Sequence, residues 1–150
     1  MKFKSIIATL AGVLFTINAF AADFSQSTPA VWGYDVVSYH TNKRPVRGSG
    51  HFVVSHNGAT YLFATLENKN TFAKDPEKYV PAYNGYCAFG VAKGKKFAAD
   101  PEVWRIVDGK LYLNLDTSIQ DLWLADTDGM IETADGNWKK IEDTDPAKLL

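Results

Sequence analysis

The sequence predicts a small single-domain α+β protein built from antiparallel β-hairpins with short helices. Two glycine turns, His56-Asn57-Gly58 and Asp108-Gly109, each separate two short β-prone segments. Segments with a helical spacing of apolar residues follow both turns. Hairpins that alternate with short helices along one chain are typical of the α+β class.

The first hairpin is predicted over residues 51–55 and 59–64. Asn57-Gly58 suits its turn, because both residues tolerate the positive φ angles of a type I′ connection. Thr65 is a suitable N-cap for a helix over residues 66–74. The Asp-Pro pair that follows is expected to end this helix, because proline favours an extended residue before it.

In the second half, residues 87–93 fit either a helix that ends at Gly94, which we favour, or a short buried strand. A second hairpin is predicted over residues 103–107 and 110–114, with alternating apolar side chains. Residues 118–125 have helical spacing, and Gly129 is expected to break that helix. A last short turn is expected before Trp138 folds back onto the domain.

The N-terminal residues resemble an export signal. Two lysines precede an uncharged apolar run, and Ala19-Phe20-Ala21 supplies the small residues that signal peptidase recognises. The predicted organisation is a signal peptide (1–21), a mobile leader (22–31), one domain (32–140) and a frayed tail (141–150). We therefore expect a periplasmic or secreted protein, with no stable membrane insertion after cleavage. The Asp-Pro-Glu sequences at Asp75 and Asp100 have different flanks and indicate no internal repeat.

Charge gives no sign of a nucleic-acid partner. The chain has 16 Lys and Arg against 17 Asp and Glu, and removal of the two lysines of residues 1–21 leaves 14 against 17. These charges are scattered rather than gathered into a basic block. A nucleic-acid binder needs such a block to pair with phosphates, so we do not expect this protein to bind nucleic acid.

Cys87 is the only cysteine, so the chain cannot form an internal disulfide. One interpretation is a thiolate nucleophile or soft-metal ligand beside a helix N-terminus, which lowers a thiol pKa. The other is a small buried apolar side chain, which is the common role of free cysteine. No residue is assigned as catalytic, except Cys87 if the protein is redox-active.

The predicted metal ligands are Cys87, His40 and His51. Sulfur and imidazole ligands favour copper or zinc over calcium or magnesium. The spacing of these residues matches no known zinc motif, so the fold must bring them together. Aromatic side chains near Cys87 form a candidate ligand pocket: Tyr83, Tyr86 and Phe89.

The chain resembles the YHS domain, and in particular the exported stand-alone bacterial proteins that consist of it. The resemblance rests on these segments: Gly33-Tyr34-Asp35-Val36-Val37, Gly58 to Tyr79, Tyr83 to Ala88, Asp100 to Trp104, Val107 to Asn114 and Ala134 to Trp138. Metal-associated YHS modules carry cysteines in a Phe-Cys-Ser-x-x-Cys-like segment. The matching stretch here, residues 63–68, has no cysteine, so those metal ligands do not carry over.

Three functions remain open at this point. The first is an exported, non-enzymatic YHS-domain protein that binds a metal ion, copper favoured, or a small ligand near Cys87. The second is a thiol-based redox protein or enzyme that uses Cys87. The third is an accessory module that acts through an unknown protein partner, with Cys87 only packed in the core.

Overall fold

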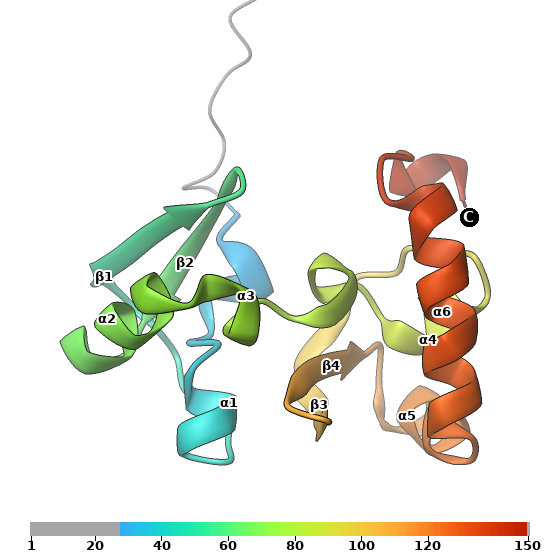
Figure 1. The fold of residues 1–150 in the computed structure, drawn as a ribbon, viewed down its shortest axis with the longest axis horizontal. Helices are drawn as coiled ribbons and strands as arrows, with labels where there is room; N and C mark the ends of the chain where they lie inside the picture. The colour runs from blue at the N-terminus through green and yellow to red at the C-terminus, as the bar shows by residue number, and fades with distance from the viewer. Residues whose placement is uncertain (1–27, 150) are drawn as a thin grey trace, which may run out of the picture.

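The structure is a computed structural model that describes residues 28–149. The predicted signal peptide and residues 22–27 of the predicted leader lie outside this range. Figure 1 shows two groups of elements along the long axis of the molecule, each with its own hairpin and helices. The fold is α+β with antiparallel hairpins, which confirms the predicted class.

The first hairpin pairs β1 (Ser49–His56) with β2 (Ala59–Phe63). Its turn uses Asn57 at φ 48° and Gly58 at φ 76°, which confirms the left-handed Asn-Gly turn. The register shifts between the Ser49 and Val53 pairs, so β1 contains an irregularity before the regular ladder.

The second hairpin pairs β3 (Asp100–Val107) with β4 (Lys110–Asn114) and has the same design. Its turn uses Asp108 at φ 49° and Gly109 at φ 77°. Its register shifts between the Asp100 and Trp104 pairs, which lie 51 residues after the shift in β1. The predicted hairpin is confirmed, and β3 begins three residues earlier than expected.

Equivalent helices follow the two hairpins. After the first come α2 (Leu66–Lys74) and α3 (Pro76–Tyr79); after the second come α5 (Thr117–Leu124) and α6 (Thr127–Ile141). Thr65 caps α2 and Asp116 caps α5, each by accepting from a backbone N–H three residues on. Asp75 and Asp126 join each helix to the next with φ −153° in both.

The prediction that Gly129 breaks the last helix is wrong. Gly129 lies in the first turn of α6, where its backbone N–H donates to Asp126 Oδ1 at 3.2 Å. The cap offsets the cost of a glycine at this position. Residues 127–141 therefore form one helix of 15 residues instead of a short turn and a returning segment.

Each hairpin is also preceded by a left-handed turn and a short helix. The turns are η1 (Ala30–Gly33) and η2 (Ala82–Gly85), and the helices are α1 (Ser38–Thr41) and α4 (Ala88–Ala92). Val31, Trp32, Tyr83 and Asn84 all have φ between 50° and 54°. Such angles are uncommon for residues other than glycine, and especially so for β-branched valine.

The chain is therefore a structural duplication. The first unit (residues 29–79) and the second unit (residues 81–141) share element order, hairpin register and turn angles. Equivalent residues lie 52 apart up to α1 and α4, and 51 apart in the hairpins. The Asp-Pro-Glu segments are not part of this match, because one begins α3 and the other begins β3.

Aromatic side chains of the first unit join the two units by reaching residues 99–104 of the second. Tyr39 Oη donates to Pro101 O at 2.8 Å, and the Tyr39 ring meets Trp104 edge-on at 5.3 Å. Within the second half of the chain, Lys96 Nζ donates to the backbone carbonyls of Glu142 and Thr144, which follow α6. None of the helices within residues 28–149 has the length and apolar character needed to cross a membrane.

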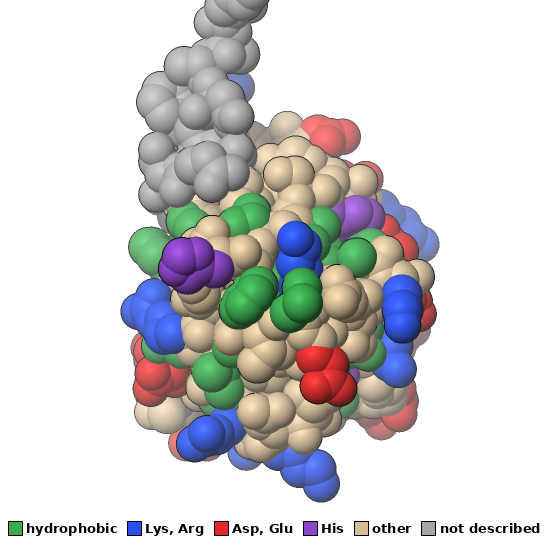
Figure 2. All heavy atoms as spheres, turned by 90° about the vertical axis from the view of Figure 1, so that its left-hand side faces the viewer, with side chains coloured by type: hydrophobic (Ala, Val, Ile, Leu, Met, Phe, Trp, Pro, Cys, Tyr) green, Lys and Arg blue, Asp and Glu red, His purple; other side chains and the backbone are tan. Residues whose placement is uncertain are grey.

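Figure 2 shows the end of the molecule formed by the first unit, where positive and negative side chains are interspersed. No block of one charge covers this face. This distribution agrees with the scattered charge of the sequence.

Candidate functional site

Cys87 lies at the N-cap of α4 and is buried, with 1 % of its surface exposed. Its Sγ accepts a hydrogen bond from Gly90 N at 3.4 Å, and the thiol donates to Asn114 Oδ1 at 3.8 Å. Burial raises the pKa of the Cys87 thiol, while the backbone N–H groups of Gly90, Leu115 and Phe89 lower it in part. The net shift is upward, so Cys87 is a protonated thiol at neutral pH.

Asp35 is the counterpart of Cys87 in the first unit, and it is also fully buried. Its carboxylate has four donors: Val37 N at 2.9 Å, Ser38 N at 3.3 Å, Ala64 N at 2.9 Å and Asn68 Nδ2 at 2.7 Å. The three backbone donors match, position by position, the three N–H groups that face the sulfur of Cys87. The thiol therefore occupies a nest of N–H groups that holds a carboxylate in the first unit.

The structure does not bring the predicted metal ligands together. Cys87 lies in a buried cluster with Tyr39 and Leu113, while His51 is exposed on β1. The His40 ring packs edge-on against Tyr79 at 5.2 Å. Within residues 28–149, no three His, Cys, Asp or Glu side chains are grouped closely enough to hold a metal ion.

The three predicted pocket aromatics have different surroundings. Tyr83 is buried, and its hydroxyl donates to Asp135 Oδ1 at 2.9 Å. Burial and this hydrogen bond raise the pKa of Tyr83. Phe89 is half-buried, with Lys93 Nζ 5.0 Å from its ring centroid. Only Tyr86 of the three lines a described cleft, one of about 230 Å³ that also contacts Trp32.

A cleft of about 560 Å³ lies where the two units meet. The first unit contributes Trp32, Tyr34 and Arg47 to its walls. The second unit contributes residues 98–102 and Leu115. Because both units are needed to form this cleft, it is a consequence of the duplicated fold.

The Trp32 indole in this cleft is exposed but held in place by a hydrogen bond. Trp32 is 57 % exposed, although it lies in the strained turn η1 and its Nε1–H donates to Ala99 O at 3.1 Å. The Arg47 guanidinium lies 4.4 Å from the Tyr34 ring centroid and donates to Trp32 O at 2.9 Å. Strained backbone that holds a large apolar side chain in solvent is a feature of binding sites.

Two carboxylates face the same cleft. Glu102 Oε1 accepts from Tyr34 Oη at 2.8 Å, and this hydrogen bond raises the pKa of Tyr34. Asp100 Oδ1 accepts from Glu102 N at 2.8 Å. Arg47 also lines the cleft, where its guanidinium contacts the Tyr34 ring and the Trp32 carbonyl. The two carboxylates and this one cation leave the lining with a net negative charge. An exposed indole beside two carboxylates suits a small organic cation.

The cleft adjoins Cys87 without exposing it. Ala99 lines the cleft and packs in the same buried cluster as Cys87. Leu115 also lines the cleft, and its backbone N–H faces the sulfur. A ligand in the cleft would therefore contact the layer of residues that covers the thiol.

Sequence reasoning did not identify Trp32, Tyr34, Arg47 or Glu102 as ligand-binding residues. The sequence did contain a sign of the two-unit arrangement, because Pro-Ala-x-x-Gly-Tyr occurs at residues 29–34 and again at 81–86. These two copies form the left-handed turns η1 and η2, and both turns line the cleft of about 230 Å³. Comparison of these copies would have indicated the duplication.

A model of the YHS domain matches residues 37–83, which span α1, the first hairpin, α2, α3 and the start of η2. No curated protein and no solved structure matches the chain significantly. The second hairpin and its helices lie beyond the matched residues, although they repeat the same architecture. The chain is thus a YHS domain-containing protein, whose matched domain corresponds to most of its first structural unit.

Proposed function

We propose that this protein is a non-enzymatic binding module that holds a small organic cation in the cleft between its two units. The observation that carries the proposal is the Trp32 indole, which is exposed in a strained turn beside Asp100 and Glu102. In this proposal the protein acts outside the cytoplasm, after removal of residues 1–21.

The ligand would have a flat apolar part and one positive group. The flat part would lie on the exposed face of Trp32, where burial of apolar surface favours binding. The positive group would face the carboxylates of Asp100 and Glu102, and cation–π attraction to the indole adds to this pairing.

Benzamidinium is a suitable probe, with benzoate as the oppositely charged control. We expect benzamidinium to shift the Trp32 indole N–H signal in NMR spectra until the site is saturated. Trp32→Ala should abolish the binding, while Leu122→Ala should not, because Leu122 on α5 is about as exposed as Trp32 but does not line the cleft. Glu102→Gln keeps an acceptor for Tyr34, so it should weaken benzamidinium binding mainly through the lost charge, by about tenfold.

Two outcomes would reject the proposal. One is the absence of a saturable shift of the Trp32 signal with benzamidinium. The other is an equal saturable shift of the Trp32 signal with benzoate, because Asp100 and Glu102 should repel an anion from this cleft.

Copper is the second candidate ligand, and it is supported by the soft sulfur donor of Cys87. Asn114 Oδ1 lies 3.8 Å from this sulfur, which leaves the thiol with one weak side-chain partner. The test is the metal content of anaerobically purified protein, with Cys87→Ser as the comparison. About one equivalent of copper or zinc that disappears in the variant would support a metal ligand. Metal-free protein that also fails to bind added Cu(I) would exclude it.

A further inference from the structure

A separate cleft of about 350 Å³ lies between α1 of the first unit and β3 of the second. Its lining consists of these residues: Tyr39, His40, Lys43, Trp104, Arg105 and Ile106. The two ionised side chains of this lining, Lys43 and Arg105, are both positive and both exposed. No carboxylate lines the cleft, in contrast to the cleft at Trp32.

His40 lines this cleft, and its ring carries a polar atom without a partner. Its Nε2 is buried and makes no hydrogen bond to any of residues 28–149. Burial lowers the pKa of His40, and the nearby Lys78 and Lys110 lower it further. The imidazole is therefore neutral at pH 7, and it can donate a hydrogen bond from Nε2 when that nitrogen carries the proton. A buried polar atom that has no partner within the protein is one that a water or an ion can satisfy.

The cleft also has an apolar wall. Trp104 and Ile106 are half-buried on β3, and the Trp104 ring is fixed by its edge-on contact with Tyr39 at 5.3 Å. The Tyr39 hydroxyl is occupied by Pro101 O. The cleft thus combines two cations, one neutral hydrogen-bond donor and a rigid aromatic surface.

We propose that this cleft binds a small organic anion, with a carboxylate or phosphate group on an apolar body. The acidic group lies among Lys43, Arg105 and His40 Nε2, and the apolar body lies against Trp104 and Ile106. Lys78 and Lys110, which act on His40 through their charge, add to the positive potential that attracts the anion. This site is independent of the cation site at Trp32, since the two clefts share no lining residue.

The test uses the purified protein with three probes: benzoate, phenyl phosphate and neutral benzyl alcohol. We expect one or both anions to shift the NMR signals of the His40 ring and the Trp104 indole in a saturable way, at concentrations up to about 10 mM. Binding of benzoate alone identifies a carboxylate ligand, and binding of phenyl phosphate alone identifies a phosphate ester. A bound anion should also raise the pKa of His40, because it favours the imidazolium form.

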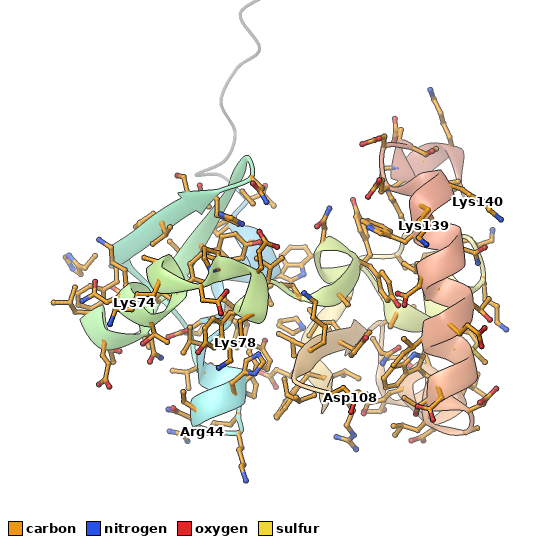
Figure 3. The ribbon with its side chains drawn as sticks, viewed as in Figure 1. Arg44, Lys74, Lys78, Asp108, Lys139 and Lys140 are labelled. Atoms are coloured by element: carbon orange, nitrogen blue, oxygen red, sulfur yellow. The ribbon has the colours of Figure 1, made fainter. Side chains whose placement is uncertain are left out.

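Charge-removing variants provide the control. Lys43→Met with Arg105→Met should weaken binding at least about tenfold, because the double variant removes both positive charges of the cleft lining. Lys139→Met with Lys140→Met removes the same charge from α6, which lies at one end of the molecule and well apart from Lys78 in Figure 3, and should leave binding unchanged. All four lysine and arginine side chains are exposed, so neither variant disturbs the core.

The proposal is overturned if neither anion gives a saturable shift of His40 and Trp104. It is also overturned if benzyl alcohol binds as tightly as the anions, or if both double variants weaken binding equally. Benzamidinium binding at Trp32 is measured on the same samples, so failure at one cleft is distinguished from failure at the other.

Discussion

Asp35 and Cys87 occupy the same position in the two units, 52 residues apart, and each is enclosed by backbone N–H groups from matching positions. Each residue follows a left-handed turn and precedes a short helix. The backbone N–H of each donates to the chain that leads into the hairpin, from Asp35 to Val46 O at 2.8 Å and from Cys87 to Phe97 O at 3.0 Å. This position therefore has the same structural role in both units, with a carboxylate in the first unit and a thiol in the second.

Replacement of Cys87 by aspartate tests this equivalence. A carboxylate at residue 87 would meet the N–H groups of Phe89, Gly90 and Leu115, as Asp35 meets their counterparts. We expect Cys87→Asp to keep the fold and to unfold near the denaturant concentration of the parent. Cys87→Leu has no acceptor and leaves the N–H groups of Gly90 and Leu115 unsatisfied, while Phe89 N keeps its bond to Asn114 Oδ1. This variant should therefore lose about 1–3 kcal/mol of unfolding free energy. Greater stability of the leucine variant than of the aspartate variant would contradict the equivalence.

The hairpins could be predicted from the sequence because their turns are local. Asn57-Gly58 and Asp108-Gly109 require positive φ, and alternation of side chains then sets the strands on either side. The helix over residues 66–74 could also be predicted from the sequence, because Thr65 and Pro76 mark its two ends. These elements depend on interactions within a few residues.

The clefts could not be predicted in the same way, because their walls come from distant segments. Trp32 reaches Ala99 and Tyr34 reaches Glu102 across 67 and 68 residues of chain. Only the packing of one unit on the other creates these contacts. The helix α6 was missed for a different reason, since the capping of Gly129 by Asp126 outweighed the low helix propensity of glycine.

The reactivity of Cys87 follows from its burial. Because its thiol is covered and its pKa is raised, little thiolate is present at neutral pH. We expect a maleimide or disulfide reagent to label the native protein slowly at pH 7 and the denatured protein at once. Fast labelling of the native protein at pH 7 would instead support the thiol-based redox function. The rate should rise with pH, since the thiolate is the reactive form.

Alkaline pH should destabilise the first unit through Tyr61. Burial, with a smaller effect of Glu77, raises the pKa of Tyr61 to about 12, while an unfolded tyrosine ionises near pH 10. The stabilising contribution is therefore complete below about pH 10 and is lost as the pH rises toward 12, on the order of 2 kcal/mol. Tyr61→Phe cannot ionise, so its unfolding free energy should fall less over this range. An equal fall in parent and variant would exclude Tyr61 as a source of the alkaline loss.

Of the glycines in the first unit, Gly48 has the least room for a side chain. A Cβ on Gly48 would lie 2.5 Å from the backbone carbonyl of Leu62, a distance that real Cβ atoms essentially never show. Gly50 lies two residues further on in β1, and a Cβ there would meet nothing within 4 Å. Gly50→Ala is therefore a matched control for Gly48→Ala, because the substitution is the same and only the surroundings differ.

We expect Gly48→Ala to lower the unfolding free energy by about 3 kcal/mol or more, because the backbone of β2 must move away from residue 48. That movement would also strain the Gly48 N–H hydrogen bond to Gly33 O, which is 2.8 Å long and ties η1 to the hairpin. Gly50→Ala should change the unfolding free energy by no more than about 0.5 kcal/mol. Chemical denaturation of both variants measures the difference, and the Trp32 indole signal reports whether η1 has moved. Equal stability of the two variants would mean that β1 and β2 separate at no cost near residue 48, and the close approach would then play no part in holding Trp32 in the cleft.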